Sequence, residues 1–257
     1  MLTFVHIFKF CSQDSCTVLA VMADVIRQLK IAMPGLKTVC YWQDNAGCYH
    51  CGTTLVCAAA LDHEGVKIRR LDFSDPQGGK AACDRKAATI RSHIRIYLKA
   101  GNDIETPEQL RDAILSSGGV PGVNVALCET VQVPKVLPSK DRGYYSPLSN
   151  VGFKEEGLLV WRAYGIGDGK LIPTDKLHCP SPSDLPTLTG ATRSYSSAFT
   201  SVKERRIKAS VRDPDPPVKR KTVTRRSSFV LRRVLSNICD IFINAAVFRL
   251  WKTPTCS

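Results

Sequence analysis

The fold of this chain is decided by residues 72–86, which read DFSDPQGGKAACDRK. The run that leads into it, Gly65–Phe73, has the composition of a strand. Proline and glycine at 76–79 then predict a loop, and apolar residues recur at helical spacing from Ala82 to Lys99. The stretch therefore joins a strand to a long helix whose first turn carries Asp84.

The sequence on the N-terminal side of this stretch predicts two strands, each followed by a helix. The strands are expected at Thr3–Phe10 and Lys37–Gln43, and the helices at Thr17–Met33 and His50–Leu61. Val39 and Tyr41 fall on one face of the second strand. This strand ends at Asp44, where Asn45 and Gly47 permit a sharp turn.

The sequence on the C-terminal side predicts shorter elements and then a loss of order. We expect a capped helix from Thr106 to Gly118-Gly119, a β-rich run at Val123–Val133, and a hairpin of Gly157–Tyr164 with Lys170–Ile172. Order is expected to fade beyond about Pro173 into a Pro- and Ser-rich linker and a basic tail. An isolated amphipathic helix is predicted within Phe229–Leu250, in preference to a membrane span.

The charge of the chain is concentrated in this tail. The 257 residues carry a formal net charge of +13, and Val202–Arg233 holds twelve basic against three acidic residues, a net +9. A basic chain favours a polyanionic partner, most commonly nucleic acid. The residues that fit a nuclear-import signal or a phosphate-binding arm are Lys219, Arg220, Lys221, Arg225 and Arg226. The odd count of 11 cysteines and the absence of a signal-peptide pattern predict reduced thiols and an intracellular protein.

Three motifs together carry a resemblance to a known family. They are the strand-end pair Asp44-Asn45, the loop Pro76-Gln77-Gly78-Gly79-Lys80, and Asp84-Arg85-Lys86 on the helix that follows. This pattern resembles the RNase H-like superfamily of DDE transposases and integrases, and in particular uncharacterised transposon-derived proteins of animals. The resemblance covers roughly the first 130 residues.

The resemblance implies roles for these residues. Asp44 takes the place of the second catalytic acid and Asp84 that of the third, where integrases usually carry Glu. Together they would bind Mg²⁺ or Mn²⁺, because two-metal phosphoryl chemistry needs converging carboxylates. The resemblance places Asn45, Lys80, Arg85 and Lys86 near the nucleic acid.

One catalytic acid of the family pattern has no counterpart in this chain. In these folds the first acid lies in the middle of the first of three antiparallel strands, whereas one strand is predicted before the first helix here. Asp14 lies in a strand-to-helix connection and does not fit the role. We therefore expect an N-terminally truncated catalytic domain with no tightly bound metal and little or no strand-transfer or nuclease activity.

Other interpretations of the same residues stay open. Asp44 fits a turn, Asp84 fits a favourable charge near a helix N-terminus, and Asp72 and Asp75 are alternative ligands. Cys48, His50 and Cys51 suggest part of a zinc site, but a second pair at the required spacing is absent, so packed thiols are the preferred interpretation.

The sequence thus predicts an α/β protein with a partial RNase H-like mixed sheet and flanking helices. The expected domains are the RNase H-like part at 1–135, a small β-rich appendage at 136–175, and the linker and disordered basic tail at 176–257. We expect a nuclear, nucleic-acid-binding protein that does not span a membrane, prefers DNA to RNA and is able to form homo-oligomers. The rival hypotheses are an active polynucleotidyl transferase completed by a partner, and an interaction module that uses the C-terminal helix.

Overall fold

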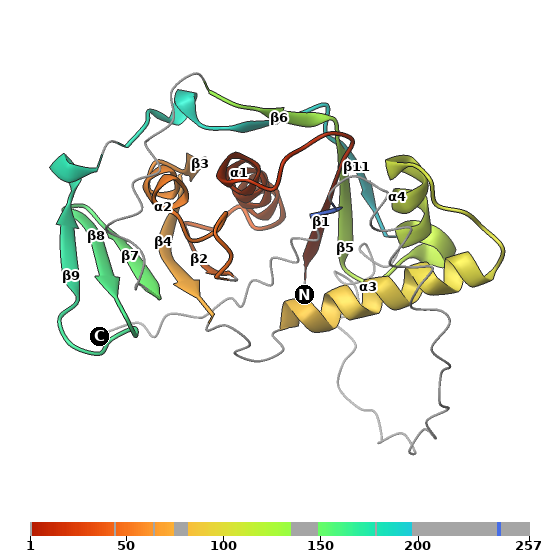
Figure 1. The fold of residues 1–257 in the computed structure, drawn as a ribbon, viewed down its shortest axis with the longest axis horizontal. Coiled ribbons are helices and arrows are strands. Elements are labelled where there is room, and N and C mark those ends of the chain that lie inside the picture. The colour runs from red at the N-terminus through yellow and green to blue at the C-terminus, as the bar shows by residue number, and fades with distance from the viewer. Residues whose placement is uncertain are drawn as a thin grey trace, which may run out of the picture. The chain divides into compact units, whose positions relative to one another are not determined.

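The computed structural model describes residues 2–43, 45–63, 65–74, 82–134, 149–177 and 179–196, together with the pair Ile241–Phe242. These residues form a mixed α/β structure (Figure 1). Its α-helices are α1 (Ser15–Ala32), α2 (Gly52–Ala59), α3 (Ala82–Lys99) and α4 (Pro107–Leu115). None of the helices in the described ranges has the length and apolar character needed to cross a membrane.

The strands fall into three sheets. The first has the order β11 (Thr192–Tyr195), β5 (Val123–Cys128), β1 (Thr3–Phe8) and β12 (Ile241–Phe242). The second has the order β2 (Thr38–Gln43), β4 (Val66–Phe73), β7 (Asn150–Lys154), β8 (Gly157–Trp161) and β9 (Lys170–Pro173), with β3 (Asp62–His63) also paired to β4. The third pairs β6 (Thr130–Gln132) with β10 (Thr187–Thr189).

The chain divides into two compact units that interleave along the sequence. The first unit comprises Met1–Phe10, Ala81–Cys128 and Ala191–Ala245, and the second comprises Cys11–Lys80, Glu129–Gly190 and Ala246–Ser257. The expected domain boundaries near residues 135 and 175 do not separate these units. The β-rich segment expected as an appendage instead supplies β7, β8 and β9 to the same sheet as β2 and β4.

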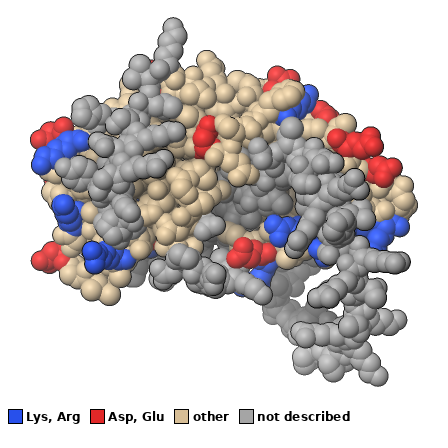
Figure 2. All heavy atoms as spheres, in the orientation of Figure 1, with Lys and Arg blue, Asp and Glu red and all other residues tan. Residues whose placement is uncertain are grey.

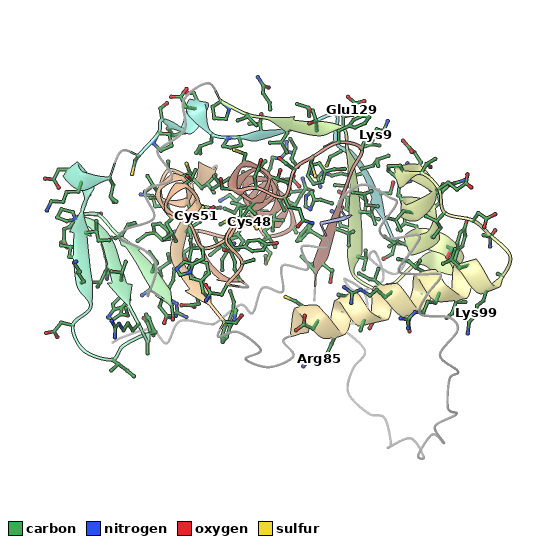
Figure 3. The ribbon with its side chains drawn as sticks, viewed as in Figure 1. Lys9, Cys48, Cys51, Arg85, Lys99 and Glu129 are labelled. Atoms are coloured by element: carbon green, nitrogen blue, oxygen red, sulfur yellow. The ribbon has the colours of Figure 1, made fainter. Side chains whose placement is uncertain are left out.

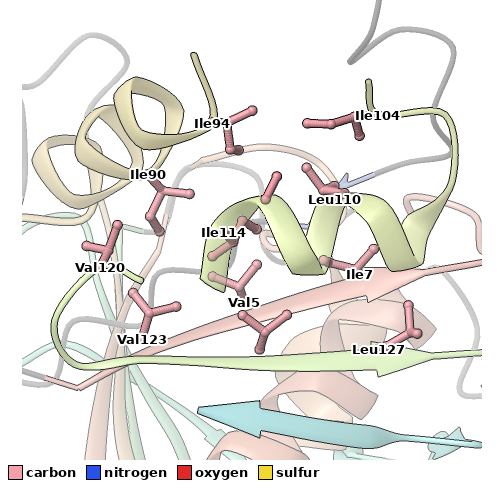
Figure 4. Close-up of a cluster of buried hydrophobic side chains, with 12 residues drawn as sticks. Val5, Ile7, Ile90, Ile94, Ile104, Leu110, Ile114, Val120, Val123 and Leu127 are labelled. Carbon is pink, nitrogen blue, oxygen red and sulfur yellow. The ribbon is translucent and has the colours of Figure 1, made fainter. Parts of the chain in front are cut away.

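The first unit is built on the parallel pair of β1 and β5, which the chain connects through α3 and α4. Strand alternation places Val5 and Ile7 of β1 on the face that packs against these helices. Ile90 and Ile94 of α3, with Leu110, Ala113 and Ile114 of α4, close the same apolar core (Figure 4). The buried stripe of α3 therefore follows the predicted helical periodicity.

The second unit packs α1 and α2 with the sheet that contains β2 and β4. Val39 and Tyr41 are buried on one face of β2, as predicted, while Trp42 lies on the other face. The hydroxyl of Tyr41 donates to the carbonyl oxygen of Met22 in α1 at 2.9 Å, which ties strand to helix. The strands β2 and β4 run parallel, so their C-terminal ends meet at one edge of the sheet.

The sheets differ from the expectation in one important respect. The sequence predicted a partial RNase H-like mixed sheet, whereas the strands that precede α3 are divided between two sheets, β1 pairing with β5 and β12 and β2 pairing with β4. All six residues of β1 are buried, so the strand has two covered faces. Local sequence pattern encodes the burial of a strand and does not specify its partner.

The C-terminal part also departs from the expectation. The linker predicted from residue 176 contains β10 and β11, which pair with β6 and β5. Ile241–Phe242, within the predicted amphipathic helix, is instead a short strand antiparallel to β1. The remainder of that predicted helix lies outside the described residues.

Candidate nucleic-acid interface

The two acids singled out from the sequence are not brought together in the described residues. Asp44 lies outside them, between the end of β2 and the exposed Asn45. Asp84 is exposed in the first turn of α3, in the first unit, whereas β2 belongs to the second unit. The shared pocket of Asp44 and Asp84 therefore stays a prediction. Lys80, Asp75 and the five basic tail residues also lie outside the described residues.

The two carboxylates that precede Asp44 in the chain have structural partners. Asp14 is the N-cap of α1, and its Oδ1 accepts from the backbone N–H of Thr17 at 2.9 Å. Asp24 is buried within α1, and its Oδ1 accepts from Arg27 at 2.8 Å. The sequence placed Asp14 correctly before the helix, because N-caps are local.

The outward face of α3 is strongly basic. Ile90 and Ile94 mark its buried side, and helical spacing places Arg85, Arg95 and Lys99 on the opposite, exposed side. Between these cations, Ala88, Thr89, Ser92 and the large apolar Ile96, which is 67% exposed, also face solvent. Arg85 and Lys99 mark the two ends of the helix (Figure 3). Separate Lys and Arg side chains, with acidic side chains nearby, are visible on the surface of the molecule in the space-filling view (Figure 2).

Lys86 is positioned differently from its neighbour Arg85. Its ammonium donates to the carbonyl oxygen of Pro121, and burial lowers its pKa. Lys86 is half-buried and engaged with the chain itself. Arg85 is therefore the residue of this pair that faces solvent.

A second feature lies in the second unit, at the C-terminal edge of β2 and β4. A pocket of about 290 Å³ is lined by the exposed Trp42, by Arg70 and Asp72 of β4, by Asn150 of β7 and by Tyr164. Asp72 is one residue before the end of β4 and only 6% exposed. It pairs directly with Trp42 in the parallel register of the two strands.

Asp72 is held by two donors. Nε of Arg70 donates to Oδ2 at 2.8 Å, and Nδ2 of Asn150 donates to Oδ1 at 2.6 Å. The guanidinium of Arg70 also lies 4.0 Å from the centre of the Tyr164 ring, within cation–π range. Burial lowers the pKa of Arg70, but the charge of Asp72 and a hydrogen bond to Tyr164 outweigh it and leave the pKa above its ordinary value.

Cysteines gather near the start of α2 in the second unit. Cys48 and the N-cap Cys51 are both half-buried (Figure 3), and Sγ of Cys51 lies 3.3 Å from Oγ1 of Thr54. Burial raises the pKa of Cys48, which favours the neutral thiol. Within the described ranges, no three His, Cys, Asp or Glu side chains are grouped so that they could hold a metal ion.

Asp84, Arg85 and Lys86 stay predictions as site residues, and the sequence does not predict the pocket of the second unit. It offers Asp72 as an alternative ligand and assigns no role to Trp42, Asn150 or Tyr164. The available signal was strand alternation, which places an indole opposite the buried Val39 and Tyr41. A comparison with protein-family models, with curated proteins and with solved structures found no match to this chain.

Proposed function

We propose that this chain is a nucleic-acid-binding protein of RNase H-like transposase ancestry that does not catalyse a reaction by itself. The observation that carries the proposal is the exposed basic face of α3, with Arg85, Arg95 and Lys99 aligned along one helix. Among the described ion pairs, Arg95 and Lys99 have no carboxylate partner. Exposed cations spaced along one helix are suited to hold phosphates.

The dimensions of α3 support contact with several phosphates. Arg85 and Lys99 are fourteen residues apart, or about 21 Å along the axis at about 1.5 Å per residue. A helix with side chains, about 10–12 Å wide, fits the DNA major groove of about 12 Å. The major groove of A-form RNA is too narrow for such a helix, so we propose DNA as the preferred partner.

The proposal of a non-catalytic role rests on the carboxylates that are present. A two-metal site needs a third acid beside Asp44 and Asp84. Asp14 is occupied in capping α1, and Asp24 is buried against Arg27. Mg²⁺ or Mn²⁺ would thus bind weakly to this chain. Nuclear localisation through Lys219, Arg220 and Lys221 is part of the same proposal.

The experiment compares two triple variants of the full chain in a fluorescence anisotropy titration with duplex DNA. The test variant carries Arg85→Ala, Arg95→Ala and Lys99→Ala. The control removes the same charge from exposed lysines of the second unit, through Lys37→Ala, Lys154→Ala and Lys176→Ala.

We expect the test variant to lose about tenfold or more in affinity and to show a salt slope lower by about 2.7, or about 0.9 per lost phosphate contact. The control variant should change much less. Equal losses in both variants would show that only total charge matters, and an unmodified chain that does not bind duplex DNA would overturn the proposal.

A further inference from the structure

We infer that the pocket formed by Trp42, Arg70, Asp72, Asn150 and Tyr164 binds one unpaired nucleobase of a single-stranded nucleic acid. The inference rests on the proposed function, since it assigns a substrate class to a nucleic-acid-binding chain. It uses a different unit and different residues from the basic face of α3. The base would stack on Trp42 and meet polar groups at the floor of the pocket, with Tyr164, whose ring lies against Arg70, as part of the pocket wall.

The exposure of the two rings is the first step of the argument. Trp42 is 72% exposed and Tyr164 is 56% exposed, although large aromatic side chains bury more apolar area than most others. Both belong to the second unit and line the same pocket. Exposed aromatic faces are the usual platforms for stacking unpaired bases, because every base has a π-face.

The size of the pocket favours a single small ring system. Its volume of about 290 Å³ is just below the range of about 300–1,000 Å³ that is typical of small-molecule sites. A longer or branched ligand would extend beyond it. A single base matches this size if its sugar and phosphate stay outside the pocket.

The charges in the pocket do not favour a cationic ligand. Arg70 and Asp72 form a salt bridge at 2.8 Å, so the two groups contribute no net charge. Arg70 already lies over the ring of Tyr164, the position that an alkylated ammonium group would take in an aromatic cage. A neutral, planar ligand is therefore favoured.

The floor of the pocket offers acceptors for base amino groups. Oδ2 of Asp72 accepts a hydrogen bond from Arg70 and Oδ1 accepts one from Asn150, and each carboxylate oxygen has two lone pairs. A carboxylate is the side chain that accepts from the exocyclic amino group of cytosine. Bases with amino groups should thus bind better than thymine or uracil.

The experiment uses the full chain and labelled single strands of about 12 nucleotides, a length within the site sizes of single-strand binders. One strand has mixed sequence and the other is abasic throughout, so that both carry the same phosphate charge. A thymine-only strand tests base choice, and an RNA strand of the mixed sequence separates RNA from DNA. The variants are Trp42→Ala, Tyr164→Ala, the ring-preserving Trp42→Phe, and the control Phe10→Ala, whose side chain is also 72% exposed.

We expect the unmodified chain to bind the mixed strand about tenfold more tightly than the abasic strand, as stacking of one base predicts. Trp42→Ala should remove most of that difference and Tyr164→Ala a part of it, while Trp42→Phe and Phe10→Ala should preserve it. Equal binding of mixed and abasic strands, or equal effects of Trp42→Ala and Phe10→Ala, would overturn the inference.

The outcome is separable from that of the proposed function. If duplex binding still depends on α3 while the abasic and mixed strands bind equally, the pocket assignment fails alone. If neither duplex DNA nor any single strand binds, the proposed function fails with it. A preference for the thymine-only strand over the mixed strand would contradict the role given to Asp72.

Discussion

Asp14 is a residue whose charge stabilises one helix. Its carboxylate accepts hydrogen bonds from Ser12 and from the backbone N–H of Thr17 at the start of α1. Partial burial raises the pKa of Asp14, but these hydrogen bonds outweigh it and hold the pKa below its ordinary value of 3.8. A depressed pKa means that the stabilisation is present above 3.8 and is lost as the pH falls through the folded-state value.

We therefore predict that Asp14→Ala lowers the free energy of unfolding by about 1 kcal/mol at about pH 7, the usual cost of losing an N-cap. The difference between Asp14→Ala and the unmodified chain should narrow as the pH falls below 3.8. Asp14→Asn is the control, because it keeps a capping side chain and does not titrate. Urea unfolding across this pH range measures the free energy of unfolding of each variant. A difference between Asp14→Ala and the unmodified chain that does not change with pH would contradict the prediction.

Asp72 shows which features of a single residue can be predicted from the sequence. Its position near the end of a strand was predictable, since the run Gly65–Phe73 has strand character. Its partner Asn150 comes 78 residues later and was not predictable, because nothing local links the two positions. The pocket was not predictable for the same reason, although strand alternation places Trp42 on the face opposite the buried Val39 and Tyr41.

At the scale of elements, α4 depends on a capping box. Thr106 Oγ1 accepts from the backbone N–H of Gln109 at 3.2 Å, and Gln109 Oε1 accepts from the backbone N–H of Thr106 at 3.0 Å. This arrangement satisfies two backbone donors at the helix N-terminus. It was predicted from the order Thr-Pro-Glu-Gln and is confirmed.

We predict that Thr106→Ala lowers the free energy of unfolding by about 1 kcal/mol. The control is Thr89→Ala, which removes a threonine from the exposed middle of α3, where its hydroxyl bonds only the carbonyl of Arg85 among the described groups. That change should be neutral or slightly stabilising, because alanine favours helix more than threonine does. Thermal unfolding of both variants measures the two changes in stability. A similar loss of stability in Thr106→Ala and Thr89→Ala would contradict a stabilising role of the cap.

Helices were predictable to within a few residues because their signals are local. The predicted helix Ala82–Lys99 coincides with α3, and the pattern at Thr17–Met33 corresponds to α1. The short strands β7, β10 and β11 were not predicted. The strands β10 and β11 pair with segments that are distant in sequence, and β7 pairs with the distant β4 as well as with the adjacent β8. Their Ser-, Thr- and Gly-containing sequences also suit loops.

At the scale of the whole molecule, the two units could not be predicted from sequence order, because each is built from segments that lie far apart in the sequence. The first unit gathers its strands from residues near 3, 123, 192 and 241. A linear division at about residues 135 and 175 follows changes in composition, whereas compact units follow contacts between distant segments. The acids at 44 and 84 come from different units, so their convergence depends on how those units assemble.

Because the convergence of Asp44 and Asp84 depends on the assembly of the two units, catalysis must be tested on the intact chain. We predict no strand nicking above background in Mg²⁺ or Mn²⁺, because catalytic acids act as a unit and Asp14 and Asp24 are engaged elsewhere. A supercoiled-plasmid assay compares the unmodified chain with Asp44→Asn and with the surface control Asp112→Asn, whose carboxylate pairs with Arg111. All three should leave the plasmid intact while duplex binding persists. Metal-dependent nicking that Asp44→Asn abolishes and Asp112→Asn preserves would instead establish an active polynucleotidyl transferase, with its remaining acid supplied by a group not yet identified.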